Sequence, residues 1–105
     1  MVNYASTITV PSATCANVAS VTLGTVGTLK SILGATITLS GLKLPSANVN
    51  AVLALLVSLD GTNGTTLWGS GKTLNISGGT NGAPTGQGIT DKATLVARGA
   101  TVTTN

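Results

Sequence analysis

The chain contains two stretches in which apolar and hydroxyl side chains alternate. In ATITLSG, Ile37 and Leu39 alternate with threonine and serine, and in TLNISG, Leu74 and Ile76 occupy the corresponding positions. A period of two residues is typical of a β-strand with one buried face. We therefore predict strands within residues 36–41 and 73–78, with their aliphatic side chains directed into the core.

A helical pattern follows the first strand. Pro45 directs the chain into the helix, and the hydroxyl of Ser46 is expected to cap the first turn. The next apolar residues recur at spacings of three and four, which places them on one helix face: Val49, Val52, Leu53, Leu56 and Leu59. The stretch is too short to span a bilayer, so we predict a core helix that ends at Gly61.

The second strand is followed by a similar pattern. Pro84 and Thr85 predict another helix start with a hydroxyl cap, and Gly99 predicts its end. The residues expected to form the buried face of this helix are Ile89, Ala93, Val96 and Leu95. Strand, loop, helix and glycine thus recur with a period of about 37 residues, which is typical of a repeat architecture.

The remaining segments fit this repeat less closely. TITVPS, residues 7–12, is a weaker first copy, and the segment after it is ambiguous between a short helix at Val26–Leu33 and further strand. ATVTTN at the C-terminus predicts a last strand. We expect one domain over residues 1–105, with an N-terminal cap or assembly segment at 1–35 and two strand-helix units at 36–105. The predicted fold is a short α/β solenoid with a parallel sheet and helices on one side; the alternative is an all-β sandwich or β-rich fibre domain.

Charged residues are scarce. Of the 105 residues, 42% are hydrophobic and only 7% are Asp, Glu, Lys or Arg, so the polar surface consists of Thr, Ser, Asn and Gly. Such a surface repels its own copies weakly and favours association. The net charge of +3 arises from scattered cations, which argues against nucleic acid as a partner.

The sequence GSGKT, residues 69–73, resembles the end of a phosphate-binding loop. That loop requires a glycine five positions before Gly71, where Thr66 stands, and it must open a helix, whereas KTLNISGG alternates as a strand. The chain has no His, no Glu and only two Asp, Asp60 and Asp91. Acid–base or nucleophilic catalysis is therefore not expected, and neither a cofactor nor a metal is predicted.

Residues 36–105 resemble the leucine-rich-repeat-like C-terminal units of phage structural proteins, including tail and fibre proteins, and of some bacterial surface proteins. LNISGGTNGAPTG followed by KATLVARGATVTTN carries this resemblance. It implies a strand-helix repeat without enzymatic residues, although the sequence has no regular asparagine position of the kind that leucine-rich repeats use. The expected location is a virion or the outside of a cell, and no secretory signal is visible in MVNYASTITVPS.

Two sets of residues are candidates for function. Thr101, Val102 and Thr103 lie in a neutral terminal strand whose free edge is expected to meet another copy. Trp68 is either a contact for a glycan or protein or a core residue beneath its loop. The predicted function is a self-associating virion, fibre or filament subunit with other virion or surface proteins as further partners. The alternative is a glycan- or receptor-binding adhesion module.

The two Asn-Gly pairs are interpreted more simply. Asn63-Gly64 and Asn81-Gly82 both lie in loops between predicted elements. Asn-Gly is a common dipeptide in tight turns because both residues tolerate a positive φ. We therefore expect turn geometry at both sites and no further role.

Overall fold

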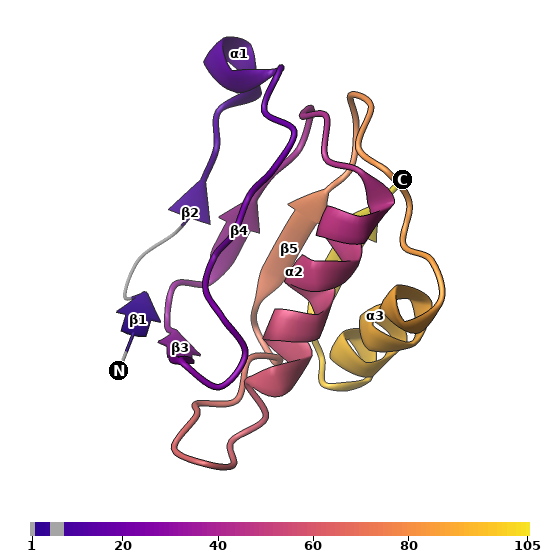
Figure 1. The fold of residues 1–105 in the computed structure, drawn as a ribbon. Helices are drawn as coiled ribbons and strands as arrows, with labels where there is room; N and C mark the ends of the chain where they lie inside the picture. Colours follow the sequence, from indigo (N-terminus) through magenta and orange to yellow (C-terminus); the bar gives the residue numbers. More distant parts are fainter. Residues whose placement is uncertain (1, 5–7) are drawn as a thin grey trace.

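The core of the protein is a parallel sheet in which strand order follows the sequence. The computed structural model describes residues 2–4 and 8–105. The sheet has the order β2-β4-β5-β6, and all neighbouring strands are parallel. Figure 1 shows these strands side by side, with both helices of the C-terminal part on the same face of the sheet. The strands are β2 (Ile8–Thr9), β4 (Thr36–Thr38), β5 (Thr73–Ile76) and β6 (Thr101–Thr104).

The alternation predicted from the sequence determines which side chains enter the core. Ile37 in β4 and Leu74 in β5 are directly opposite in the register, and both are fully buried. Ile8 and Val102 continue this row into β2 and β6 and are partly buried against the core. The predicted strands and their orientation are therefore confirmed in this part of the chain.

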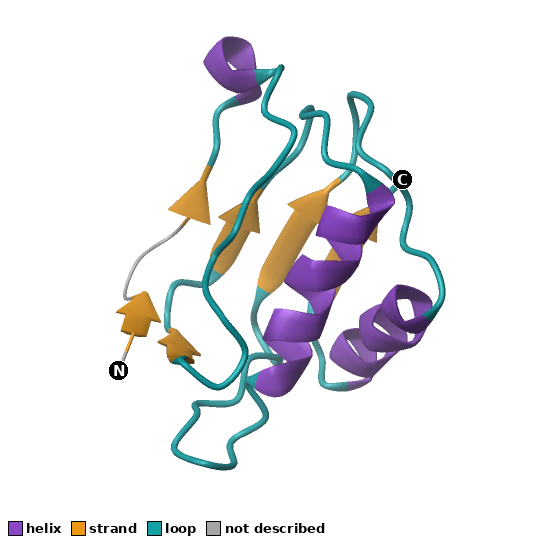
Figure 2. Cartoon of the chain, in the orientation of Figure 1, coloured by secondary structure: helices purple, strands orange, loops and turns teal. Residues whose placement is uncertain are grey.

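Two helices cover the apolar face of the sheet. They are α2 (Ser46–Ser58) and α3 (Gln87–Ala97), each in the connection between two neighbouring strands. Figure 2 shows α2 in front of the strands, with α3 beside it. The apolar residues predicted for the first helix are all buried: Val49, Val52, Leu53, Leu56 and Leu59. The fold is mixed α/β, so the all-β alternative is wrong.

The predicted buried face of the second helix is also wrong. Ile89 and Val96 are 60% and 50% exposed, and Ala93 is exposed as well, so among the residues predicted there only Leu95 enters the core. The buried positions of α3 are Gly88, Asp91 and Leu95. Gly88 suits this orientation, because a Cβ there would overlap the side chain of Asn50 in α2. The absence of a side chain lets the two helices approach.

The ends of the helices differ in part from the prediction. Neither Ser46 nor Thr85 forms a side-chain cap; Ser46 is the first residue of α2, and the Thr85 hydroxyl accepts a hydrogen bond from Nδ2 of Asn50 instead. Gly99 ends α3 as predicted. It has a φ of +96° and donates to Val96 O, while the following Ala100 N–H donates to Leu95 O. This pair of bonds is the Schellman arrangement.

The N-terminal segment contains short elements. Strands β1 (Val2–Tyr4) and β3 (Leu29–Ile32) form a separate parallel pair, and α1 (Ser12–Cys15) follows β2. The segment that the sequence left ambiguous is thus a strand at its C-terminal end. The segment predicted as a weaker first copy, residues 7–12, contains β2 and the first residue of α1, and its Thr7 lies outside the described residues. Residues 16–28 run as a loop alongside α2 (Figure 1).

Asparagine side chains connect neighbouring segments beyond the sheet. Asn81 is 4% exposed; its Oδ1 accepts from Leu44 N at 2.9 Å, and its Nδ2 donates to Leu39 O and Ile76 O. Asn48 forms two bonds with the backbone of Val21 in the preceding loop. Asn105 bonds to the backbone of Gly78 and Asn81. The interpretation of Asn81 as a turn residue only is therefore wrong.

Candidate functional site

The residues predicted to self-associate lie in the edge strand β6. Within the described residues, β6 pairs with β5 and has no strand on its other side. Thr101 and Thr103 are exposed and Val102 is half-buried. Thr101 N donates to Lys72 O at 2.9 Å, so in the alternating pattern of a parallel ladder the backbone groups of Val102 and Thr104 face away from the sheet. These groups are available to another strand.

An exposed apolar row on α3 lies at the same end of the molecule. Ile89, Ala93 and Val96 follow at spacings of four and three residues, so they share one side of the helix, and we call them the α3 stripe. Helix α3 contacts both α2 and β6. In Figure 1 it lies beyond α2 in the same direction in which β6 lies beyond β5. The sequence analysis missed this surface because it placed the stripe in the core.

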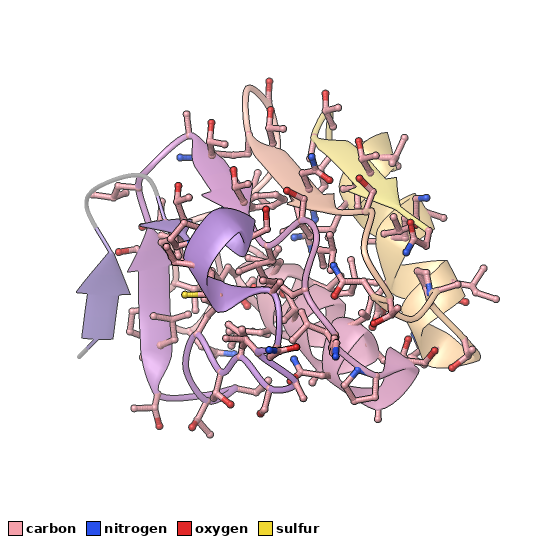
Figure 3. All side chains as sticks on the ribbon, turned by 90° about the horizontal axis from the view of Figure 1, so that it is seen from above. Carbon is pink, nitrogen blue, oxygen red and sulfur yellow. The ribbon has the colours of Figure 1, made fainter. Side chains whose placement is uncertain are left out.

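The outer face of the sheet, opposite the helices, carries short polar side chains in register. Thr9, Thr38, Asn75 and Thr103 form one row across the four strands, and Thr36, Thr73 and Thr101 form the next. These seven side chains are exposed or half-buried. In Figure 3, side chains project from the strands on the side away from the helices. Among the described residues no helix covers this face (Figure 1).

Trp68 is fully buried. Of the two interpretations left open by the sequence, the structure supports the core residue, and Trp68 presents no ring to a ligand at the surface. Its Nε1 is buried without a hydrogen-bond partner. An unpaired buried N–H destabilises the folded state, and the large apolar area of the indole ring offsets this cost.

Arg98 bonds to the backbone around this ring. Its Nη2 donates to Val57 O at 2.9 Å, and its Nη1 lies 3.3 Å from Leu56 O and Leu59 O and 3.4 Å from Trp68 O. The first three acceptors belong to the last turn of α2 and to its C-cap Leu59, where the helix dipole favours a cation. Arg98 therefore holds the end of α2 against the end of α3.

The GSGKT segment is a turn that leads into a strand. Gly71 has a φ of +76°, Lys72 N donates to Gly69 O, and β5 begins at Thr73. Nζ of Lys72 donates to Leu33 O at 2.7 Å. No helix follows this turn, so it lacks the helix N-terminus on which a phosphate-binding loop depends.

The two carboxylates have local partners. Asp60 is fully exposed, and hydrogen bonds from the hydroxyl and backbone N–H of Thr62 lower its pKa below the ordinary 3.8. Asp91 is buried and accepts from Nε2 of Gln87 at 3.0 Å. The described residues contain no group of three or more His, Cys, Asp or Glu that could hold a metal ion.

One open cavity of about 350 Å³ lies between residues 19–24 and the outer side of α2. Apolar side chains form most of its wall, including Val21, Leu23, Val52 and Leu55. The polar residues of the wall are Ser20, Thr22 and Asn48, and the Asn48 amide already bonds to the backbone of Val21. The wall therefore offers a ligand few polar contacts.

Comparison with family models, with curated proteins and with solved structures finds no match for this chain. Of the helices in residues 2–4 and 8–105, none combines the length and apolar character that a bilayer crossing requires.

Proposed function

We propose that this chain is a non-enzymatic structural subunit that self-associates through the surface formed by β6 and the α3 stripe. The observation that carries this proposal is that an open strand edge and an exposed apolar row lie at the same end of the molecule. A second copy placed there satisfies the outward backbone groups of β6 and removes Ile89 and Val96 from water. Both effects favour association.

The proposed architecture is a short solenoid similar to leucine-rich repeats. Strands stack in register from β2 to β6, α3 stacks on α2, and asparagine side chains connect neighbouring units. In such arrays each unit contacts its neighbours only, so an end unit exposes surfaces equivalent to those buried inside. We accordingly place the protein in a virion, a fibre or an extracellular filament.

The alternative, a glycan- or receptor-binding adhesion module, has less support. Its proposed aromatic contact was Trp68, which is fully buried. Sugar binding commonly relies on an accessible aromatic ring against the apolar side of the sugar. Among the side chains that the structure describes, no aromatic ring is exposed.

The test is the mass of the protein in solution, measured by sedimentation velocity over a range of concentrations together with negative-stain microscopy. Ile89→Lys with Val96→Lys introduces two charges into the α3 stripe, and Thr101→Lys with Thr103→Lys introduces two at β6. Both substitution pairs affect exposed side chains and should leave the core intact. The matched control is Leu67→Lys, because Leu67 is also 50% exposed but lies in the loop after α2.

We expect the parent and Leu67→Lys to form oligomers or filaments and both double variants to sediment as monomers. A ring or a filament results according to whether the contact closes on itself. A parent that stays monomeric at high concentration refutes the proposal. If the double variants assemble like the parent, the contact between copies lies on another surface, and the proposed surface is wrong.

A further inference from the structure

The Asn63-Gly64 peptide lies at the tip of an exposed turn. Thr65 N donates to Thr62 O at 2.9 Å, and the two residues between them have φ values of +52° and +80°. Both of these residues are exposed. Among the described residues, neither the side-chain amide of Asn63 nor the backbone N–H of Gly64 has a hydrogen-bond partner. These two neighbouring groups are therefore free to react with each other.

An asparagine that precedes glycine can lose ammonia without an enzyme. The backbone nitrogen of Gly64 attacks Cγ of Asn63, the Cγ–Nδ2 bond breaks, and Nδ2 leaves as ammonia with the proton of the attacking nitrogen. The product is a succinimide ring, and the space around Gly64 leaves room for it, because even a Cβ there would have no atom within 4 Å. The attack requires rotation of the Asn63 backbone, and exposed turns with few contacts open at low free energy.

Lys30 contacts the peptide group that supplies the attacking nitrogen. Its Nζ donates to Asn63 O at 3.2 Å, while its backbone lies in β3 and accepts from Thr66 N. The nitrogen of Gly64 becomes nucleophilic when it loses its proton, and the negative charge that develops is shared with Asn63 O. An ammonium group beside this oxygen stabilises that charge. Lys30 therefore favours the attack.

The same contact affects how the ring opens. Water that adds to the former main-chain carbonyl of Asn63 breaks its bond to Gly64 N, returns a proton to that nitrogen and leaves a carboxylate. The backbone then continues through Cγ, which is isoaspartate. Water that adds at Cγ gives ordinary aspartate instead. Lys30 polarises the first of these carbonyls and pairs with the carboxylate formed from it, so it favours isoaspartate.

Asn81-Gly82 has the same local sequence but a different environment. Both pairs follow a threonine, in TNGT and TNGA. The Asn81 side chain is buried with both polar atoms bonded, and Gly82 N donates to Leu44 O at 2.7 Å. A Cβ at Gly82 would overlap the backbone of Ser46, so the segment is closely packed. Neither the amide nor the nitrogen of this pair is free.

From this contrast we infer that Asn63 is a site of spontaneous deamidation, promoted by Lys30 and yielding mainly isoaspartate, whereas the fold protects Asn81. Each event replaces an uncharged amide by a carboxylate and lowers the net charge of +3 by one. The inference does not depend on the proposed self-association, because it involves residues of neither β6 nor the α3 stripe.

The test is incubation of the folded parent chain at neutral pH and body temperature, with samples taken over several weeks. Ion exchange separates the deamidated form, peptide mapping by mass spectrometry locates it, and an isoaspartate-specific methyltransferase measures the share of isoaspartate. Lys30→Met removes the ammonium group. Lys72→Met is the matched control, because Nζ of Lys72 donates to Leu33 O instead. A parallel incubation in urea exposes both Asn-Gly pairs, and circular dichroism establishes which variants are folded.

We expect Asn63 to convert at least several-fold faster than Asn81 in the folded parent, and the two to convert at similar rates in urea. Lys30→Met should slow the conversion of Asn63 and lower its share of isoaspartate, whereas Lys72→Met should match the parent. Asn63 that stays intact, or converts no faster than Asn81 in the folded parent, overturns the inference whether or not the variants fold. Conversion of folded Lys30→Met at the parent's rate or faster refutes the role of Lys30.

Discussion

Two asparagines precede glycine in this chain, and the structure predicts opposite responses to the same substitution. Asn81 is 4% exposed and forms three hydrogen bonds with backbone atoms of Leu39, Leu44 and Ile76. Asn63 is exposed in a loop with a φ of +52°. Replacing either amide by a carboxyl keeps the shape of the side chain. Asn81→Asp and Asn63→Asp therefore compare two environments with chemistry held constant.

The loss of stability expected for Asn81→Asp follows from the atoms that Nδ2 of Asn81 contacts in the parent chain. Two carbonyl oxygens, Leu39 O at 2.9 Å and Ile76 O at 3.1 Å, would face a carboxylate oxygen. Burial and these acceptors favour the neutral acid, which raises the pKa of the introduced carboxyl above the value of about 3.9 in the unfolded chain. Keeping it neutral at pH 7 costs about 4 kcal/mol, at 1.36 kcal/mol per pH unit. One lost hydrogen bond adds about 1 kcal/mol.

The pH dependence has a definite sign. Because the folded chain holds this proton more tightly than the unfolded chain, Asn81→Asp loses stability relative to the parent as the pH rises above about 3.9. The penalty is expected to be roughly 1 to 2 kcal/mol at pH 4 and about 5 kcal/mol at pH 7. Small domains are stable by about 5 to 15 kcal/mol, so the variant should be close to unfolding at neutral pH. Asn63→Asp should change stability by less than about 0.5 kcal/mol, because its carboxylate stays in water.

Urea unfolding followed by circular dichroism at pH 4 and pH 7 measures these differences for the parent and both variants. Equal stabilities of Asn81→Asp and Asn63→Asp at pH 7 would contradict the buried network. A penalty for Asn81→Asp that is the same at both pH values would show that the introduced carboxyl is solvated.

Three further predictions concern the core, the end of α2 and a surface carboxylate. Leu56 is fully buried, so Leu56→Ala should lower the free energy of unfolding by roughly 2 to 5 kcal/mol, measured by thermal or urea unfolding. The control Leu67→Ala should lower it by less than about 0.5 kcal/mol. Equal effects of the two substitutions would refute the packing of α2. Arg98→Ala removes a cation from several backbone carbonyls and should cost at least about 2 kcal/mol, and unchanged unfolding would contradict that role. Hydrogen bonds from Thr62 lower the pKa of Asp60 in the folded chain, so they contribute a small stabilisation above pH 3.8. This stabilisation is lost as the pH falls through the lowered pKa that Asp60 has in the folded chain. A carboxyl titration by NMR should show its midpoint rise in Thr62→Ala, and an unchanged midpoint would exclude this hydrogen bond.

The order and type of the main elements could be predicted from the sequence because each is determined by local periodicity. Ile37 and Leu74 alternate with hydroxyl residues, and this alternation alone assigns one face of each strand to the core. Val49 to Leu59 form a wide apolar face that identifies α2 without knowledge of its neighbours. A helix between successive strands favours a parallel arrangement, because parallel neighbours need a crossover connection of this length. The expected strand order, with the last strand at the edge, came from the recurrence of the strand-helix unit, because successive repeats stack on one another.

The tertiary structure decided what local periodicity leaves undetermined. Helix α3 has apolar residues on more than one side, and its buried side is the one on which Gly88 lies against the side chain of Asn50 in α2. In this orientation Ile89 and Val96 are exposed to solvent, and they form part of the surface to which we assign self-association. Asn63 and Asn81 precede glycine alike, yet of these two it is the Asn81 side chain that bonds to backbone groups of a neighbouring segment. Close approach of distant segments decides such roles, because hydrogen bonding and steric exclusion act between residues that the sequence separates.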